Sequence, residues 1–310
     1  MKCDIVIISF NTKELVHNCI DTAFATSQNL INRIIVVDNA SSDGTIQYIK
    51  KLFPNVITIE NKVNYGYAYA VNQGVAECKS EIVVIANSDI IFTECALEIL
   101  INELTKDANC ALTFPRLVYP DGRYQYSYGE LPSAKSALSE ILLIKSFENH
   151  LRKYLFNKFD LDLPKWNFGY ADGALLVVRK SVFDKIGGFD IDFPFYSEDM
   201  DFSYRVRAHG YKIKFCRKAR IIHIRGGSSN PNKFSYETTE RLLRSKVIFA
   251  RKHLKPYSFK FYARAQIFKS KLILLISNVI EKVINKNFAN IEFHLNNSKI
   301  WKEILNEMKH

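Results

Sequence analysis

The chain has 310 residues, of which 47% are hydrophobic and 24% charged, as is typical of a globular protein with one large domain or two. Its net charge of +11 is concentrated in residues 231–310, which hold 16 Lys and Arg against 6 Asp and Glu. The longest uninterrupted apolar run near the C-terminus, residues 272–276, excludes a membrane span there, because a span needs roughly 20 apolar residues.

Residues 1–115 alternate between short apolar segments and amphipathic ones. The pattern predicts strands over 4–9, 33–37, 56–59, 82–86 and 110–114, and helices over 13–25, 45–52, 68–78 and 96–104. This alternation indicates βαβ units and a mostly parallel sheet. Because strands such as "IIVV" and "IVVIA" are apolar at every position, we expect both faces of the sheet to be covered.

The pattern changes after residue 115. We expect a loop or hairpin over 118–130, a helical excursion over 133–159, a strand over 174–178, a helix over 200–208, and short strands over 212–215 and 219–223. The composition of residues 226–232 predicts a linker, and the basic tail beyond it is mainly helical. The chain therefore divides into two halves of one domain, 1–115 and 116–230, followed by a C-terminal extension, 231–310.

Short polar residues follow each of the first four predicted strands. In an open parallel sheet, ligands bind beyond the carboxyl ends of the strands. Each such residue alone has an ordinary alternative role in a turn or a helix cap, but their gathering at one edge favours a polar ligand. No Gly-x-Gly-x-x-Gly and no Gly-x-x-x-x-Gly-Lys-[Ser/Thr] is present, which argues against a dinucleotide-dependent hydride-transfer enzyme and a P-loop NTPase.

Several of these segments together resemble a known family. The segments "DIVIISFNT", "IIVVDNASSDGT", "NYGYAYAVNQG" and "VVIANSDI" resemble the successive motifs of family 2 glycosyltransferases, which have the GT-A fold. The later block "GALLVVRKSVFDKIGGFDIDFPFYSEDMDFSYRVRAHGYKIKF" and the segment "ARIIHIRGGSS" are similar to the acceptor half of the rhamnosyltransferase-like branch. The resemblance covers roughly residues 3–230.

The resemblance implies an α/β GT-A fold, a mostly parallel central sheet flanked by helices, with residues 1–115 binding the nucleotide-sugar and 116–230 the acceptor. It also implies a metal-dependent, inverting hexosyltransferase that uses Mg²⁺ or Mn²⁺. The donor would be dTDP-rhamnose or a UDP-hexose, and the acceptor a saccharide hydroxyl in bacterial surface polysaccharide assembly, such as O-antigen or capsule. Inversion would take place in a single displacement, without a covalent enzyme intermediate.

The resemblance also assigns roles in nucleotide-sugar binding. Ser9 and Asn11 would line the nucleotide pocket, Asp38 would accept a hydrogen bond from the pyrimidine base, and Asp43 would lie near the ribose. Asn64 and Gly66 would flank the nucleotide-sugar, with Gly66 allowing a close backbone approach.

Asp89 would hold the divalent cation that bridges the donor diphosphate. By the same resemblance Asn87 also belongs to the nucleotide-sugar-binding residues. It stands where relatives have the first carboxylate of an Asp-x-Asp motif, so Asp89 is the one charged residue of this segment. We therefore expect the metal to bind weakly without the nucleotide, with diphosphate oxygens and water completing its shell. His223, at the end of an apolar strand, is either a core histidine or a further ligand of this site.

The pair Glu198-Asp199 has two interpretations. Acidic residues are favourable at the start of a helix. The aromatic run Phe193-Pro194-Phe195-Tyr196 before the pair could instead raise a carboxyl pKa toward that of a useful base, and could stack on a sugar ring. By resemblance, Asp199 is the general base, Glu198 orients it or the acceptor, and Asp172 contacts the donor sugar or the acceptor.

The basic tail contains an apolar helical stripe bordered by lysines. The stripe is Phe268, Leu272, Leu275, Val279 and Val283, and the lysines are Lys269, Lys271, Lys282 and Lys286. The helix either packs on the catalytic domain or lies on an anionic membrane leaflet, which would suit a lipid-linked acceptor. The tail has no recognised nucleic-acid-binding module, so we expect no nucleic-acid partner; the oligomeric state stays open.

The sequence has no secretory signal and has six scattered cysteines without a Cys-x-x-Cys pair. We therefore expect a cytoplasmic location with reduced thiols, peripheral to the inner face of the cell membrane.

Two other functions compete with the transferase. A sugar-phosphate nucleotidyltransferase would have a Gly-rich basic loop after the first strand, and Ser9-Phe10-Asn11-Thr12 is not such a loop. A non-catalytic carbohydrate-binding descendant of a transferase would not need to retain Asp38, Asp89 and Asp199.

Overall fold

The computed structural model describes residues 1–142, 144–161, 168–193, 196–224, 236–284 and 291–307. They belong to two compact units. The first, here the sheet unit, comprises Met1–Gly129, Lys153–Pro194 and Glu198–Pro231; the second, the helical unit, comprises Glu130–Arg152, Phe195–Ser197 and Asn232–His310. The predicted linker at 226–232, together with Pro194, Phe195 and Lys286, lies outside the described residues.

The sheet unit is built on one eight-stranded sheet with the order β3-β2-β1-β4-β9-β6-β10-β5. Its strands are β1 Cys3–Ser9, β2 Ile31–Asp38, β3 Ile57–Glu60, β4 Ile82–Asn87, β5 Ile90–Ile91, β6 Cys110–Val118, β9 Leu175–Arg179 and β10 Lys212–His223. β9 is antiparallel to β4 and β6, and β5 is antiparallel to β10, while the other pairs are parallel. The mostly parallel sheet predicted from the sequence is confirmed.

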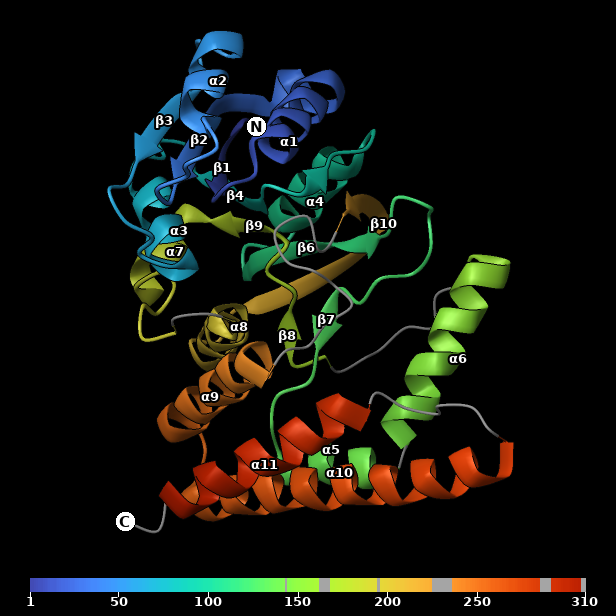
Figure 1. Ribbon diagram of the computed structural model, residues 1–310. Helices are drawn as coiled ribbons and strands as arrows, with labels where there is room; N and C mark the ends of the chain where they lie inside the picture. Colours follow the sequence, from blue (N-terminus) through green and yellow to red (C-terminus); the bar gives the residue numbers. More distant parts are fainter. Residues whose placement is uncertain (143, 162–167, 194–195, 225–235, 285–290, 308–310) are drawn as a thin grey trace. The chain divides into compact units, whose positions relative to one another are not determined.

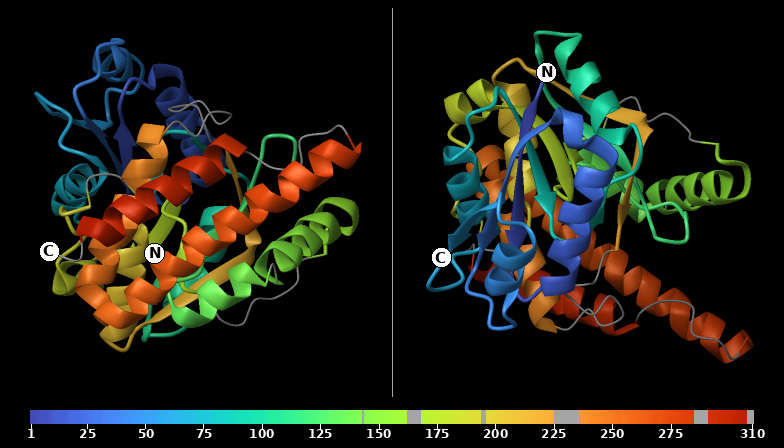
Figure 2. Two further views of the ribbon diagram at one scale, coloured as in Figure 1. Left: turned by 60° about the horizontal axis from the view of Figure 1, so that its bottom comes forward. Right: turned by 90° about the horizontal axis from the view of Figure 1, so that it is seen from above.

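Helices cover both faces of this sheet (Figures 1 and 2). The helices α1 Lys13–Ser27, α2 Thr45–Leu52 and α4 Ala96–Thr105 contribute to one core, and α3 Tyr67–Ala76, α7 Lys180–Ile186 and α8 Glu198–Ala208 contribute to the other. In β1, Ile5 and Ile7 point into the first core, and Val6 and Ile8 into the second. Burial on both sides explains why the strand is apolar at every position.

Several details differ from the predicted elements, among them the unpredicted short strand β5 and three others. The segments 212–215 and 219–223 form one strand, β10, with a register shift between Cys216 and Arg220, so the two-strand prediction is wrong. The charged Arg217 and Lys218 fall in this irregular stretch and interrupt the apolar pattern. The other two are an unpredicted short sheet, which pairs β7 Tyr128–Gly129 with β8 Tyr170–Ala171, and the unpredicted helix α7.

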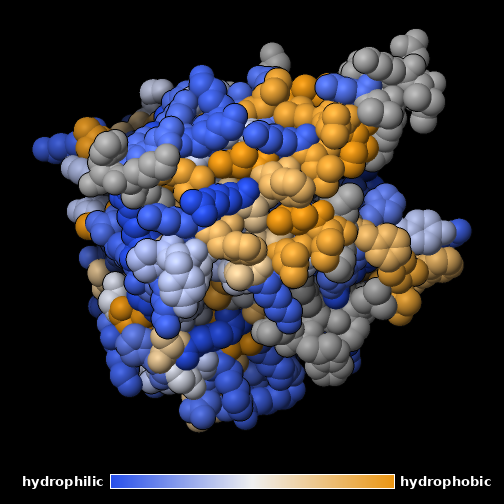
Figure 3. Space-filling view, turned by 90° about the horizontal axis from the view of Figure 1, so that it is seen from below, coloured by the Kyte–Doolittle hydropathy of each residue, from blue (hydrophilic) through white to orange (hydrophobic). Residues whose placement is uncertain are grey.

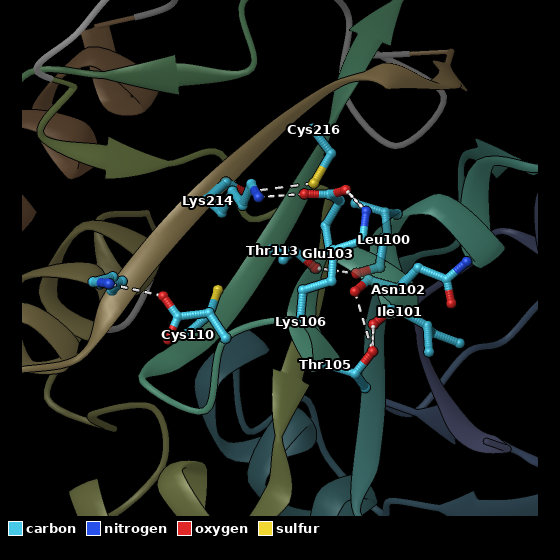
Figure 4. Close-up of polar contacts among 12 residues, drawn as sticks. Leu100, Ile101, Asn102, Glu103, Thr105, Lys106, Cys110, Thr113, Lys214 and Cys216 are labelled. Carbon is cyan, nitrogen blue, oxygen red and sulfur yellow. Dashed lines mark hydrogen bonds and ion pairs between the residues drawn. The ribbon is translucent and has the colours of Figure 1, made fainter.

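A polar cluster fixes α4 against β6 and β10. Figure 4 shows the Glu103 carboxylate between the ammonium groups of Lys106 and Lys214, and the Thr113 hydroxyl donates to the Leu100 carbonyl at 3.0 Å. Hydrogen bonds from Lys106 and Lys214 lower the pKa of Glu103 to about 2. Lys214 belongs to the first part of β10, so this cluster lies away from the carboxyl ends of the strands.

The helical unit has a small apolar core of its own. Its helices are α5 Ala134–Ile141, α9 Tyr236–His253, α10 Pro256–Ile284 and α11 Ile291–Glu307, and α6 Ile144–Phe159 begins in it. The α10 helix packs along α11 and α5 (Figure 2, left), and Trp301 is buried with its ring centroid 5.9 Å from those of Phe259 and Tyr262. The helical excursion predicted over 133–159 is thus in two pieces, α5 and α6.

Two further observations bear on sequence-based expectations. None of the helices in the part of the chain that the structure describes is long and apolar enough to cross a membrane. Each of the six cysteines is a free thiol, and Cys95 is the exposed one.

Asp4, at the amino end of β1, is fully buried and gives a test of how the sheet unit is held together. Its carboxylate accepts hydrogen bonds from Arg33 Nη2 at 2.8 Å, from Asn32 Nδ2, from Ser80 Oγ and from the N–H groups of Lys79 and Ser80. Burial raises the pKa of Asp4, but these donors outweigh burial and lower the pKa from 3.8 to about 2.

We expect Asp4→Asn to lower the free energy of unfolding by about 2–3 kcal/mol at pH 7, because the amide cannot satisfy the same donors. Since the folded-state pKa is the lower one, the stabilisation is complete above about pH 4 and is lost as the pH falls toward 2. Urea unfolding at several pH values measures this, with Asp121→Asn in an exposed loop as control. If Asp4→Asn lowered the free energy of unfolding by the same amount at pH 7 and at pH 2, the result would contradict this prediction.

Candidate active site

The parallel strands bring the predicted site residues to one edge of the sheet. Ser9, Asp38, Asn87 and His223 end β1, β2, β4 and β10, respectively. Because β9 runs the opposite way, the residues that precede it, among them Asp172, reach the same edge. The backbone N–H of Asn87 donates to the Ala174 carbonyl at 3.0 Å, which joins the end of β4 to the start of β9.

The loops after β1 and β2 fasten each other. Asp38 is buried, and its two carboxylate oxygens accept from the Ser41 N–H at 2.8 Å and the Ser41 hydroxyl at 2.5 Å. Asn11, in a left-handed conformation, donates its N–H to Ser41 Oγ and accepts from the Ser42 N–H, each at 2.8 Å. Asp38 and Asn11 are therefore held rigidly side by side at the predicted nucleotide pocket.

Asp43 has a structural task that the sequence did not reveal. Its carboxylate accepts from the N–H of Lys13 and from the N–H of Thr45, each at 3.1 Å, and these are the first residues of α1 and α2. A carboxylate that caps two helix starts fixes both helices at this edge. Its contact with a ribose stays a prediction.

The turn after β3 is tied to the turn after β2. Asn64 Oδ1 accepts from the Gly66 N–H at 2.9 Å, and Asn39 Nδ2 donates to the Gly66 carbonyl at 3.1 Å. Gly66 has φ 87°, a conformation that a side chain would strain, and it immediately precedes α3. The backbone of Gly66 thus turns at the edge where a close approach to a ligand was predicted.

Two carboxylate side chains, those of Glu198 and Asp199, lie at the start of α8. Asp199 accepts at Oδ2 from the Gly173 N–H at 2.9 Å and at Oδ1 from the Met200 N–H at 2.7 Å. A Cβ on Gly173 would come within 3.1 Å of the Asp199 Cβ, so the glycine allows this close packing. Glu198 is buried, and its Oε2 has no hydrogen-bond partner among the described residues.

Burial and mutual repulsion raise the pKa values of both carboxyl groups. For Glu198 the main cause is burial, followed by the charge of Asp199; for Asp199 it is burial, followed by the charge of Asp172. The direction agrees with the sequence-based expectation for a base, but the repulsion from Asp172 was not predicted. A carboxylate with a raised pKa can accept a proton near neutral pH.

Tyr67, the first residue of α3, was missed by sequence reasoning. Its hydroxyl donates to the Gly173 carbonyl at 3.2 Å. Burial raises the pKa of Tyr67, and the charges of Glu198, Asp199, Asp172 and Asp89 raise it further, in that order. These carboxylates therefore lie close enough for their charges to act on the Tyr67 hydroxyl. The available signal was its place in "NYGYAYA", one residue after Gly66.

Asp89 and His223 face each other at the other end of the site. The distance between Asp89 Oδ1 and His223 Nε2 is 3.3 Å, and both side chains are nearly buried. The pairing of β10 with β5 places His223 opposite Ile90, and the Ile224 N–H donates to the Asp89 carbonyl at 3.0 Å. His223 is thus buried and faces Asp89, and its role as a further ligand of this site stays a prediction.

A second residue that the sequence did not reveal, Gln125, contacts the other nitrogen of this imidazole. Gln125 Oε1 lies 2.6 Å from His223 Nδ1, and Gln125 Nε2 donates to the His223 carbonyl at 3.1 Å. Because an amide oxygen can only accept, Nδ1 bears the hydrogen. In the neutral imidazole, Nε2 then directs its lone pair toward Asp89.

These residues fit a divalent cation. A carboxylate oxygen and an imidazole lone pair 3.3 Å apart repel each other unless a proton or a cation lies between them. Asn87 Oδ1 is buried and has no partner among the described residues, so it is a third available donor atom on the same turn. Within the described ranges, no group of three His, Cys, Asp or Glu side chains could hold a metal. Ligands from elsewhere would have to complete the shell.

Comparison with protein families agrees with this arrangement. The model of the family described as glycosyl transferase family 2 matches residues 4–187, which is more than half of the chain. The chain belongs to glycosyl transferase family 2. A second model, glycosyl transferase family group 2, matches residues 152–265.

The curated relatives of this family 2 glycosyltransferase include two rhamnosyltransferases. An N-acetylglucosaminyl-diphospho-decaprenol L-rhamnosyltransferase of Mycobacterium tuberculosis is 24% identical over 214 residues, which are 66% of this chain and 70% of that protein. The O-antigen chain rhamnosyltransferase WbaN of Salmonella anatum is 26% identical over 203 residues, 65% of this chain and 59% of that protein.

Solved structures confirm the predicted GT-A fold. The mannosyltransferase PcManGT from Pyrobaculum calidifontis, in complex with GDP-Man and Mn²⁺, has a TM-score of 0.62 at 16% identity and covers 99% of this chain and 87% of its own. GalNAc-T7 with UDP, GalNAc and Mn²⁺ has a TM-score of 0.60 at 15% identity and covers 100% of this chain and 58% of its own.

The carboxylate pair predicts a pH-dependent stability. Both pKa values are higher in the folded protein than in the unfolded chain, so the folded protein retains protons that the unfolded chain releases above about pH 4.5. The free energy of unfolding therefore falls as the pH rises from about 4.5 to about 8. We expect Glu198→Gln to be more stable than the parent by about 2 kcal/mol at pH 8 and equal to it at pH 4.

Urea unfolding at pH 4, 6 and 8 measures this difference. Glu77→Gln, at an exposed position after α3, is the matched control and should leave the pH dependence unchanged. If Glu198→Gln were less stable than the parent at pH 8, burial and charge repulsion would not be the main effects of Glu198 and Asp199 on stability.

Proposed function

We propose that this chain is an inverting, metal-dependent hexosyltransferase. It transfers a hexose or deoxyhexose from a nucleotide-diphosphate sugar, dTDP-rhamnose or a UDP-hexose, to a hydroxyl group of a saccharide acceptor. The process served is the assembly of bacterial surface polysaccharide, such as O-antigen or capsule. The single observation that supports this most is the arrangement of Asp199.

Asp199 has the properties of a general base. Two backbone N–H groups, those of Gly173 and Met200, hold its carboxylate in one orientation. Its raised pKa, which burial and the neighbouring Asp172 cause, makes it a better proton acceptor than an ordinary aspartate. In this proposal Glu198 orients Asp199 or the acceptor hydroxyl, and its buried Oε2, which has no hydrogen-bond partner among the described residues, supports that role.

The reaction follows from these placements. Asp199 takes the proton of the acceptor hydroxyl as its oxygen attacks the anomeric carbon, and the bond from that carbon to the diphosphate oxygen breaks with inversion. Asp172 contacts the donor sugar or the acceptor, and the hydroxyl of Tyr67 donates to the carbonyl of Gly173, whose N–H holds Asp199. No covalent enzyme intermediate is involved.

The donor nucleotide lies along the first four strands in this proposal. Ser9 and Asn11 line its pocket, Asp38 accepts from the base, and Asp43 lies near the ribose. Asn64 and Gly66 flank the diphosphate-sugar portion. Asp89 and His223, with Asn87 Oδ1 as a neutral donor, would hold Mg²⁺ or Mn²⁺, which when bound neutralises the charge of the departing diphosphate.

The relatives support the choice of substrates. The two named rhamnosyltransferases favour dTDP-rhamnose, while the UDP in the GalNAc-T7 structure keeps a UDP-hexose as the rival donor. The relative from Mycobacterium tuberculosis is named for a diphospho-decaprenol saccharide, which supports a lipid-linked acceptor. We therefore place the enzyme in the cytoplasm, peripheral to the inner face of the membrane.

A screen of donor hydrolysis and transfer with dTDP-rhamnose and UDP-hexoses tests the proposal. We expect Asp199→Asn to lower the rate by about 10²–10⁴-fold, because general-base catalysis is lost. Stabilisation by UDP or dTDP with Mn²⁺, measured as a thermal shift, should persist. Asp184→Asn, at an exposed position of α7, is the control. A variant as fast as the parent would remove Asp199 from the base role, and absence of nucleotide stabilisation in the parent would count against a transferase.

A further inference from the structure

One side of α10 exposes large apolar side chains to solvent. Tyr257, Phe261, Phe268 and Leu275 follow each other at spacings of four, seven and seven residues, so they share one face of the helix. Their exposed fractions lie between 48% and 68%. The stripe predicted from the sequence therefore continues toward the start of the helix, while the side chains of Val279 and Val283 lie outside the described residues.

Cationic side chains lie within the same stripe. Arg264 and Lys271 are exposed between the apolar residues of the stripe, and no carboxylate of the described part of the chain is paired with either. The neighbouring α5 with its C-cap Leu142 repeats this composition, since Lys135, Leu138 and Leu142 are exposed at spacings of three and four. We call these residues of α10 and α5 the lipid face. Figure 3 shows apolar side chains gathered on this side of the helical unit, next to hydrophilic ones.

We propose that the lipid face docks on a membrane leaflet that contains anionic lipid. Aromatic rings, leucines and basic residues on one face are the pattern of helices that lie in the plane of the membrane interface. At 1.5 Å per residue, α10 is about 43 Å long and could rest on the surface along its length. It does not span the membrane, since no described helix meets that requirement.

The charge of the face selects this occupant over a second copy of the chain. Two lipid faces brought together would gather the exposed cations of both copies, Arg264, Lys271 and Lys135, in one contact to which the lipid face itself contributes no carboxylate. Anionic headgroups provide the complementary charge, and the acyl region accepts the rings and leucines. The inference rests on the proposed function, because membrane binding would bring the enzyme to a lipid-linked acceptor. Its test measures membrane binding rather than sugar transfer.

Co-sedimentation of the full chain with vesicles tests the proposal. We expect the chain to bind phosphatidylcholine vesicles in which about a quarter of the lipid is phosphatidylglycerol. Binding to vesicles of pure phosphatidylcholine should be at least about tenfold weaker. Arg264→Gln with Lys271→Gln should reduce binding about tenfold, and so should Phe268→Glu with Leu275→Glu. Arg251→Gln with Lys302→Gln removes the same charge from exposed positions outside the lipid face and should change binding less than threefold.

Three outcomes would overturn the proposal: no binding to anionic vesicles, an equal loss in the control pair, or a dimer in solution that Phe268→Glu with Leu275→Glu dissolves. Donor hydrolysis without vesicles distinguishes a failure here from a failure of the proposed function, since the lipid-face variants should hydrolyse the donor as fast as the parent. Unfolding curves of all variants identify any that do not fold.

A second inference stands on a different observation, the contact of Gln125 with His223. We infer that Gln125 is a positioning residue that fixes the His223 tautomer, so that Nε2 is available as a ligand beside Asp89. Gln125 is 1% exposed, and its two hydrogen bonds to His223 require opposite ends of its amide. A flipped amide would place its oxygen against the His223 carbonyl, so the orientation is determined.

Without this contact the imidazole could place its hydrogen on Nε2 and donate to Asp89. The nitrogen would then have no lone pair for a cation, and one oxygen of Asp89 would be occupied. Residues that hold the far nitrogen of a ligand histidine typically contribute 10–100-fold to metal affinity. Gln125 thus acts through His223, not on the substrate.

Two substitutions test this role. We expect Gln125→Leu to weaken Mn²⁺ binding in the presence of UDP by about 10–100-fold, measured from the signal of free Mn²⁺ in electron paramagnetic resonance. Gln125→Glu keeps an acceptor for Nδ1–H and should stay within about fivefold of the parent. Ring ¹⁵N chemical shifts of His223 without metal should show hydrogen on Nδ1 in the parent and a tautomer mixture in Gln125→Leu.

Unchanged Mn²⁺ affinity in Gln125→Leu, or hydrogen on Nε2 in the parent, would overturn the inference. The metal-free ¹⁵N measurement separates this failure from that of the proposed function, because the tautomer can be read even if the parent binds no Mn²⁺. Urea unfolding of Gln125→Leu shows whether a loss of affinity comes from a loss of the fold.

Discussion

The direction of the strands is the constraint on which the rest of the molecule depends. Because β1, β2, β4 and β10 are parallel, their carboxyl ends present Ser9, Asp38, Asn87 and His223 along one edge. The reversed β9 then supplies Gly173 at the same edge, where its N–H holds Asp199. Residues separated by up to 214 positions meet there because the strand directions bring them to the same edge.

The carboxyl-end edge of the sheet lowers the stability of the folded protein. Glu198 and Asp199 are removed from water beside Asp172, and Asn87 Oδ1 and Glu198 Oε2 have no partners among the described residues. The opposite ends of the strands contain the compensating contacts, such as the five donors to Asp4 and the Glu103 cluster on α4. The sheet unit is thus stable at the amino end of its sheet and chemically poised at the carboxyl end.

Much of this was accessible from the sequence because it depends on local patterns. Apolar strands, helix periodicity and the polar residues after each strand predicted the sheet, its direction and the edge at which Asp38 and Asp89 lie, whereas Asp199 was singled out by resemblance to the family. Tyr67 and Gln125 were missed because their roles depend on partners 106 and 98 residues away. The continuity of β10 across a bulge, and the grouping of α5 with the C-terminal helices, depend likewise on tertiary packing that no short window contains.

The neutral Asn87 beside Asp89 has a thermodynamic consequence under the proposed function. A cation held by one carboxylate, one imidazole and one amide needs the diphosphate to complete its shell. Binding free energies are reciprocal, so the nucleotide raises the affinity for the cation by the same factor as the cation raises the affinity for the nucleotide. Under the proposed function, departure of the nucleotide would weaken the binding of the cation as well, so both would have to be taken up again for the next cycle.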